Sequence, residues 1–197
     1  MFNSKYRLIT VSGKIAVGTT TLTKNLINSL GWKHVNIGAI QREYDRQHKL
    51  HENKIGALSR TDEHEKEMDA MTEKMLKAEK EIIYEAWLAG FFARSYKDVL
   101  KVLLICSHDD IRVDRVANRD SVSVKEAKNW IRQRESENTD KWKRLYGDYD
   151  FWNPKYFDLV INTYKAGPLE TLGKVLDMIG YNDNPTNTTN ATNPTNK

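Results

Sequence analysis

The stretch GKIAVGTT, residues 13–20, decides how the rest of the chain is interpreted. It fits the pattern G-x-x-x-x-G-K-[ST] at every position but one, because Thr19 stands where the pattern has a lysine. In loops of this pattern, backbone N–H groups surround nucleotide phosphates, the lysine reaches the β- and γ-phosphates, and the last hydroxyl binds Mg²⁺. Thr20 occupies the position of that hydroxyl. The stretch therefore predicts a phosphate-binding loop that lacks its usual cation.

The residues on either side of the loop provide the setting that such a loop needs. Residues 6–11 are mostly apolar and β-branched, which predicts a buried strand. Residues 19–30 carry leucine and isoleucine at three- and four-residue steps, which predicts a helix that ends at Gly31. The start of that helix offers N–H groups and a positive dipole end to an anion. Strand, glycine loop and helix together strengthen the prediction of phosphate binding over that of a plain tight turn.

The missing lysine needs a replacement, because Thr19 is uncharged. Lys14 lies inside the same loop and is the nearest cation in the sequence. We hypothesise that its ammonium group reaches the phosphates from the other side of the loop. The residues expected to bind ATP and its phosphates are Gly13, Lys14, Val17, Gly18, Thr19, Thr20, Thr21 and Arg115.

Further along the chain, apolar runs alternate with helical patterns. Additional strands are expected at residues 33–37, 81–85, 99–105 and 157–163, and helices after residue 38, through the polar stretch 48–80, and at 109–118, 123–145 and 168–179. Ser123 and Glu126 have the spacing of a capping box. Five strands that alternate with helices predict an α/β layer fold with a mostly parallel sheet, which binds ligands at the carboxyl ends of its strands.

Composition limits the class of protein. The 197 residues are enough for one domain, 39% are hydrophobic and 29% are charged, and no apolar run has the roughly 20 residues that span a bilayer. The amino-terminal residues lack the pattern of a signal peptide, and Cys106 is the single cysteine, so we expect a cytoplasmic protein without membrane contacts. Residues 182–197 are rich in Asn, Thr and Pro and are expected to form a disordered tail.

The net charge of +4 does not by itself indicate a nucleic-acid partner. Basic residues in the predicted helices are interspersed with acidic ones, which is typical of solvated helix faces. A nucleic-acid interface would need a cationic stripe uninterrupted by Glu135, Glu137 and Asp140. We therefore expect no nucleic-acid partner.

Several charged residues fall where they could act on a bound phosphate. Glu85 ends a predicted strand and could hold the hydration shell of Mg²⁺ or orient an attacking oxygen, although an exposed acid at the end of a strand is the alternative. Arg42 could bind an acceptor phosphate, or could be a surface arginine. Arg115 and Arg119 lie four residues apart on one helix face, and Arg134 falls on the next predicted helix. Such a cluster could neutralise charge during phosphoryl transfer.

Several segments carry a resemblance to a known family. They are the loop at 13–20, NIGAIQRE at 36–43, EAWLAG at 85–90, RVDRVANR at 112–119, RESE at 134–137, and DLVINT at 158–163. In this order they resemble the nucleoside monophosphate kinases, in particular cytidylate kinases of the short archaeal type, over about residues 6–179. The resemblance implies a three-layer P-loop kinase fold with a five-stranded parallel sheet, within a domain of residues 1–181.

The activity that the resemblance implies is transfer of the γ-phosphoryl group of ATP to CMP or dCMP with Mg²⁺. It also implies a helical acceptor-binding segment at about residues 36–80, a lid at about 118–148, and a monomer whose partners are ATP and a nucleoside monophosphate. Residue by residue, Arg42 matches the family's acceptor-phosphate arginine, Arg115, Arg119 and Arg134 match its lid-side arginines, and Lys141 stands near a common lid arginine. Together with the residues of the loop, this leads us to expect catalysis by Lys14, Glu85, Arg119 and Arg134, acceptor binding by Gly38, Arg42 and Lys141, and Mg²⁺ binding by Thr20 and, through water, Glu85.

The sequence departs from the family pattern on both sides of the expected site. Trp87 stands where the family has an arginine in E-G-R, and Asn138 stands where an acid is usual. Two expected cations are therefore absent, the lysine at position 19 and the arginine at position 87. Each hydrogen bond from such a cation to a phosphate is worth about 1.5–3 kcal/mol. The alternative to a kinase is therefore a nucleotide-binding sensor derived from one. The identity of the acceptor base stays open.

Overall fold

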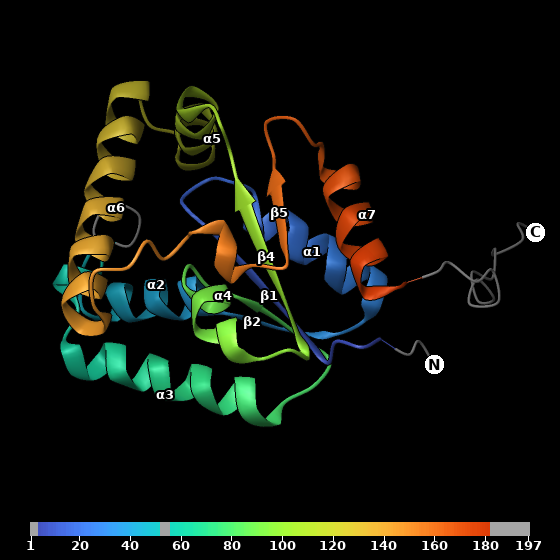
Figure 1. The fold of residues 1–197 in the computed structure, drawn as a ribbon. Helices are drawn as coiled ribbons and strands as arrows, with labels where there is room; N and C mark the ends of the chain where they lie inside the picture. Colours follow the sequence, from blue (N-terminus) through green and yellow to red (C-terminus); the bar gives the residue numbers. More distant parts are fainter. Residues whose placement is uncertain (1–3, 52–55, 182–197) are drawn as a thin grey trace, which may run out of the picture.

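The computed structural model describes residues 4–51 and 56–181, and within them five parallel strands form one sheet (Figure 1). The strands are β1 (Leu8–Gly13), β2 (Lys33–Asn36), β3 (Ile82–Glu85), β4 (Val99–Ile105) and β5 (Leu159–Asn162). Their order in the sheet is β2-β3-β1-β4-β5, and every pair is parallel. The expected α/β fold with a five-stranded parallel sheet is confirmed. The predicted tail at 182–197 lies outside the described residues.

Helices connect the strands and cover the sheet. They are α1 (Thr19–Leu30), α2 (Ile37–Gln47), α3 (Asp62–Ala78), α4 (Ala89–Phe92), α5 (Asp109–Asp120), α6 (Val124–Tyr146) and α7 (Pro168–Ile179), with short 3-10 turns η1 (Ala57–Ser59), η2 (Ala93–Ser95) and η3 (Pro154–Tyr156). Among these described helices, none has the length and apolar character to cross a membrane.

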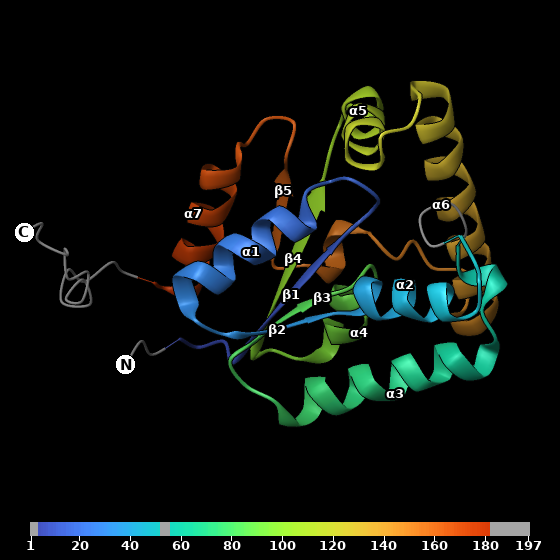
Figure 2. The same cartoon turned by 180° about the vertical axis from the view of Figure 1, so that it is seen from behind.

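Two hydrophobic cores, one on each face of the sheet, give the molecule three layers. Successive residues of a strand point to opposite faces, and along β1 the side chains of Ile9 and Val11 enter one core while Leu8 enters the other. Figure 2 shows α1 and α7 covering the first face, where Leu26 and Val175 join that core. Helices α3 and α4 supply the second core. Because β1 is paired on both sides and covered on both faces, all six of its residues are buried.

Local sequence signals set several helix boundaries. Gly31 follows α1 in a left-handed conformation with φ of 66°, as its position after the apolar stripe predicts. The capping box of Ser123 and Glu126 is present at the start of α6. The prediction of helix throughout 48–80 is wrong in extent: α3 begins only after Thr61, whose hydroxyl accepts a hydrogen bond from the His64 N–H, and the turn η1 precedes it.

We expect that replacing Gly90 by alanine destabilises the fold. Its N–H donates to Ser12 Oγ at 2.9 Å, which fixes the backbone of α4 against β1, and an added Cβ would lie 2.7 Å from Cδ1 of the Phe157 ring. Overpacking of this kind costs about 1–3 kcal/mol. Thermal unfolding should show a melting temperature several degrees lower. Gly173→Ala is the matched control, because no atom of another described segment lies within 4 Å of the added methyl; equal melting temperatures for the two variants would contradict the expectation.

Candidate active site

A cavity of about 670 Å³ lies at the carboxyl ends of β1 and β3. Its size is typical of a small-molecule site. It brings together most of the residues singled out in the sequence, namely Gly13, Lys14, Gly18, Thr19, Thr20, Thr21, Gly38, Arg42, Glu85, Arg115, Arg119 and Arg134. Val17, which is buried beneath the loop, and Lys141 do not line it. Cys106 is partly buried against the first core and does not line the cavity.

Two glycines allow the loop its tight path. A Cβ on Gly13 would lie 2.7 Å from the carbonyl oxygen of Leu104, so no larger residue fits without displacing β4. Gly18 has φ of 100° and is the N-cap of α1, a left-handed conformation that favours glycine. The loop therefore ends at a helix N-terminus that opens into the cavity, where backbone N–H groups and the helix dipole favour an anion.

Side chains from two distant segments hold the carbonyl groups of the loop. Arg112 donates through Nε to the carbonyl of Ile15 at 2.9 Å, and Arg115 donates through Nη1 to that of Ala16 at 3.0 Å. The Thr163 hydroxyl donates to the carbonyl of Val17 at 2.8 Å. These contacts fix the loop from its outer side. Arg115 thus holds the loop as well as lining the cavity.

Arg112 and Thr163 were not predicted as site residues, although the sequence contained a signal for the first. Arg112 is three residues before Arg115 and so lies on the same face of α5. Arg112 is buried and also pairs with Asp109 and Glu135. Nothing local in the sequence indicated that Thr163 returns to the loop.

Glu85 is the most completely bonded acid of the site. One carboxylate oxygen, Oε1, accepts a hydrogen bond from the Thr20 hydroxyl at 2.8 Å. The other, Oε2, accepts from Thr23 at 3.0 Å and Asn36 at 2.7 Å, and lies 3.1 Å from His34 Nε2. Because Glu85 is only 6% exposed, the alternative of an exposed acid at the end of a strand is wrong.

The sheet register explains why these groups meet. Glu85 lies opposite Val11 on β1 and opposite Asn36 on β2, so the ends of three neighbouring strands carry the loop, the acid and the amide. Oε2 of Glu85 is therefore occupied by hydrogen bonds with the side chains of Thr23, Asn36 and His34. Oε1 and the Thr20 hydroxyl form the polar pair beside the phosphate-binding loop.

Three arginines from three helices line the same cavity: Arg42 from α2, Arg119 from α5 and Arg134 from α6. Burial, together with the neighbouring charges of Arg42 and Arg119, lowers the pKa of Arg134 to about 10. Among the described residues, the buried Nε of Arg134 has no hydrogen-bond partner. The proximity of these like charges is electrostatically unfavourable, and a polyanion bound among them would offset the repulsion.

Lys14 lies at an aromatic edge of the cavity. The residue is exposed, and its Nζ lies 5.1 Å from the ring centroid of Trp152. The rings of Trp87, Trp142 and Trp152 contact one another and pack with Phe151 in a small apolar cluster. These three tryptophans therefore pack against one another beside the cavity.

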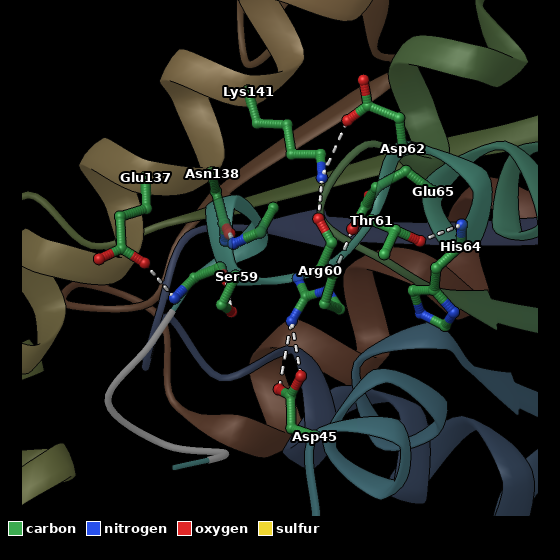
Figure 3. Close-up of polar contacts among 12 residues, drawn as sticks. Asp45, Ser59, Arg60, Thr61, Asp62, His64, Glu65, Glu137, Asn138 and Lys141 are labelled. Carbon is green, nitrogen blue, oxygen red and sulfur yellow. Dashed lines mark hydrogen bonds and ion pairs between the residues drawn. The ribbon is translucent and has the colours of Figure 1, made fainter. Parts of the chain in front are cut away.

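Lys141 belongs to a buried polar network that joins α6 to the segment before α3 (Figure 3). Its side chain is 1% exposed, its ammonium group donates to the carbonyl of Arg60, and Nζ lies 3.3 Å from Asp62 Oδ1. The Arg60 guanidinium in turn pairs with Asp45 at 3.2 Å and Glu65 at 3.0 Å. The structure therefore places Lys141 in the scaffold, away from the cavity where acceptor binding was expected.

The same network explains the amide at position 138. Asn138 Oδ1 accepts a hydrogen bond from the N–H of Ala57, and Glu137 accepts one from the N–H of Gly56, each at 2.5 Å (Figure 3). A buried backbone N–H without a partner is costly, so both side chains stabilise the turn η1 against α6. Thus α6 carries one cavity arginine and three side chains that anchor the neighbouring segment.

The fold and the loop at its ligand-binding edge define an α/β P-loop kinase. In comparisons with solved structures, the chain is similar to an uncharacterized protein from Eubacterium ventriosum, with a TM-score of 0.65 at 14% identity over 89% of this chain and 99% of that one. It is also similar to shikimate kinase from Acinetobacter baumannii, with a TM-score of 0.55 at 13% identity over 90% and 95% of the two chains. At such identities the likeness shows the fold alone.

Sequence comparisons place the chain more narrowly. The model of the cytidylate kinase-like family matches residues 8–165. The cytidylate kinase of Thermococcus sibiricus is 34% identical over 83% of this chain and 83% of its own length, and that of Pyrococcus abyssi is 34% identical over 82% and 87%. The chain belongs to the cytidylate kinase-like family.

Proposed function

We propose that this protein is a nucleoside monophosphate kinase that transfers the γ-phosphoryl group of ATP to CMP or dCMP. The observation that carries the proposal is that one cavity joins the phosphate-binding loop and Glu85 to three arginines from three different helices. A site for phosphoryl transfer needs a cradle for the donor and cations for the charge shared with the acceptor. The names of the relatives from Thermococcus sibiricus and Pyrococcus abyssi support cytidine nucleotides as acceptors.

The residues present at the loop fit a magnesium ion. Thr20 and Glu85 offer a hydroxyl and a carboxylate oxygen 2.8 Å apart, and Mg²⁺ prefers such oxygen ligands together with water and phosphate. The ion would neutralise charge on the phosphate oxygens during transfer. Glu85 is held in place for this role by Thr23, Asn36 and His34, which engage its other oxygen.

In this proposal one arginine binds the phosphate of the acceptor nucleotide, and two others contact the phosphoryl group that is transferred. Arg42, beside Gly38 on α2, binds the acceptor phosphate, and an added Cβ on Gly38 would lie 3.3 Å from Arg42 Nη1, so the small residue leaves room for the guanidinium. Arg119 and Arg134 stabilise the charge that develops on the transferred group. The acceptor-binding segment at 36–80 and the lid at 118–148 supply these side chains and close over the nucleotides.

A coupled assay of ATP consumption against a panel of nucleoside monophosphates tests the proposal. We expect turnover with CMP and dCMP, dependent on Mg²⁺. ATP binding, measured separately by calorimetry, distinguishes the alternatives. Binding without turnover on any acceptor would contradict the kinase and identify the nucleotide sensor that the absent lysine at position 19 suggests.

We expect Lys14→Ala to lower kcat/KM for ATP by about 10–100-fold. A charged hydrogen bond to phosphate is worth about 1.5–3 kcal/mol, and Lys14 is the cation within the loop that lines the cavity. Steady-state kinetics at saturating CMP measure the effect. Lys24→Ala, an exposed lysine on α1 outside the cavity, is the control and should leave the rate unchanged. Full turnover by Lys14→Ala would show that its ammonium group does not replace the absent lysine.

A further inference from the structure

A second, smaller cavity of about 50 Å³ opens beside the first. It lies among α2, α3, the end of β3 and α6. Gly38, Ala86 and Trp87 line both cavities, so the small one leads away from the large one at the end where Arg42 lies. A molecule whose phosphate is bound by Arg42 would therefore have its remaining part directed toward the small cavity.

The walls of this side cavity suit a flat, partly polar group. Its apolar lining includes Met68, Leu88, Phe92 and Trp142, and its polar lining includes Gln41, Glu65, Asp69, Thr72, Tyr84 and Tyr146. A site that holds one water needs about 10–15 Å³, so the space corresponds to about four waters. That size favours a single ring over a fused pair of rings.

Most of the polar groups in the side cavity already have partners. Glu65 is paired with the buried Arg60, and the hydroxyls of Thr72 and Tyr84 are hydrogen-bonded to each other. Asp69 differs, because both of its oxygens accept from a single donor, the Tyr146 hydroxyl, at 2.9 and 2.8 Å. Between residues 4–51 and 56–181, no Lys, Arg or His forms an ion pair with it.

Asp69 is thus a carboxylate with unused capacity to accept hydrogen bonds. Two oxygens offer about four lone-pair sites, of which one O–H fills only a part. Burial and the nearby charge of Glu65 raise the pKa of Asp69, and the hydrogen bond from Tyr146 opposes that rise. An N–H group brought into the cavity would supply a further hydrogen bond.

We propose that the side cavity binds the base of the acceptor nucleotide and that Asp69 selects cytosine by accepting a hydrogen bond from its exocyclic amine. The proposal rests on the proposed function and deepens it. Uracil carries a carbonyl oxygen where cytosine carries the amine. With uracil, the Asp69 carboxylate and that carbonyl oxygen would face each other without a hydrogen between them, so neither would gain a hydrogen bond. Purines, which also carry amines, are disfavoured by the size of the cavity. Trp87 lines both cavities and so lies at their junction.

The test compares CMP and UMP as acceptors for the full chain and for Asp69→Asn. The asparagine removes the negative charge and adds an N–H₂ group that is able to donate to the uracil carbonyl. We expect kcat/KM for CMP to fall at least tenfold while that for UMP is kept or rises, so that the ratio of the two falls more than tenfold. The dissociation constants of CMP and UMP, measured by calorimetry, should change in the same ratio.

Tyr146→Phe is the matched control, because it removes the same hydrogen bond between α3 and α6 but keeps the carboxylate. It should change both acceptors by one common factor. Glu73→Gln, an exposed carboxylate on the same helix that does not line the cavity, should change neither. Melting temperatures show that each variant is folded.

The outcomes separate this proposal from the proposed function. If the unmodified protein phosphorylates CMP but Asp69→Asn lowers CMP and UMP equally, as Tyr146→Phe does, Asp69 is structural and the proposal is overturned while the kinase stands. If the unmodified protein shows no turnover, the ratio of the two dissociation constants still decides the role of Asp69. If it binds neither nucleotide, the side cavity is not a base site.

Discussion

Replacing Arg134 by methionine should lower kcat/KM for both substrates by roughly 10³-fold or more while raising the melting temperature of the free protein. An arginine that neutralises the transferred phosphoryl group is worth about 10³–10⁵ in rate. The Nε of the same guanidinium is buried without a partner among the described residues, and the group is repelled by Arg42 and Arg119. Arg134 Cζ lies 6.0 Å from the ring centroid of Trp87, and methionine removes the repulsion while it keeps an apolar side chain beside that ring.

Steady-state kinetics and thermal unfolding in the absence of nucleotide measure the two effects. A gain of 1 kcal/mol corresponds to about 2–4 °C in a chain of this size. Arg132→Met, an exposed residue on the same helix, is the control and should change neither activity nor stability appreciably. A variant at position 134 that loses stability together with activity would show that Arg134 supports the fold, and not the transferred charge.

Glu85→Gln should lower kcat by about 10²–10³-fold with only a small loss of stability. A glutamine is able to place its oxygen toward Thr23, Asn36 and His34 and its N–H₂ group toward Thr20, whose hydroxyl also accepts. The fold therefore keeps its hydrogen bonds. The site, however, loses the carboxylate oxygen that we propose for the hydration shell of Mg²⁺, and the Thr20 hydroxyl is engaged as an acceptor.

A titration of activity with Mg²⁺, at saturating ATP and CMP, measures this prediction. Glu73→Gln serves again as the exposed control. Glu85→Ala should behave differently, because it leaves the buried Thr23 hydroxyl without this acceptor, at about 1–3 kcal/mol, and also removes the acceptor of Thr20, Asn36 and His34, so it should lower the melting temperature. An unchanged rate and an unchanged Mg²⁺ requirement for Glu85→Gln would remove Glu85 from the proposed reaction.

The sequence was sufficient to predict those parts of the fold that depend on local chemistry. The strand before the loop, the helix from Thr19 to Leu30 and its stop at Gly31 follow from burial pattern and glycine conformation, and all three are confirmed. The capping box of Ser123 and Glu126 is confirmed for the same reason. The placement of Glu85 beside Thr20 followed from the rule that parallel strands carry their ligands at the carboxyl ends.

Features that depend on contacts between distant segments were not predictable in this way. Arg112 bonds a loop carbonyl 97 positions away in the sequence, and Thr163 bonds one 146 positions away. No local sequence pattern predicts either hydrogen bond. Lys141 shows the same limit, since resemblance placed it at the acceptor but tertiary packing turns it toward Arg60 and Asp62. The break before α3 depends on the same network.

The buried network between α6 and the turn η1 has a consequence for exchanging segments between relatives. Glu137, Asn138 and Lys141 bind backbone N–H and carbonyl groups at residues 56–60, so the recognition depends on the path of that turn and little on its side chains. A chimera that receives residues 56–60 from a relative whose turn has another length would remove these backbone partners from Glu137 and from the buried side chains of Asn138 and Lys141. Such a graft should fold only if residues 137–141 are transferred with it.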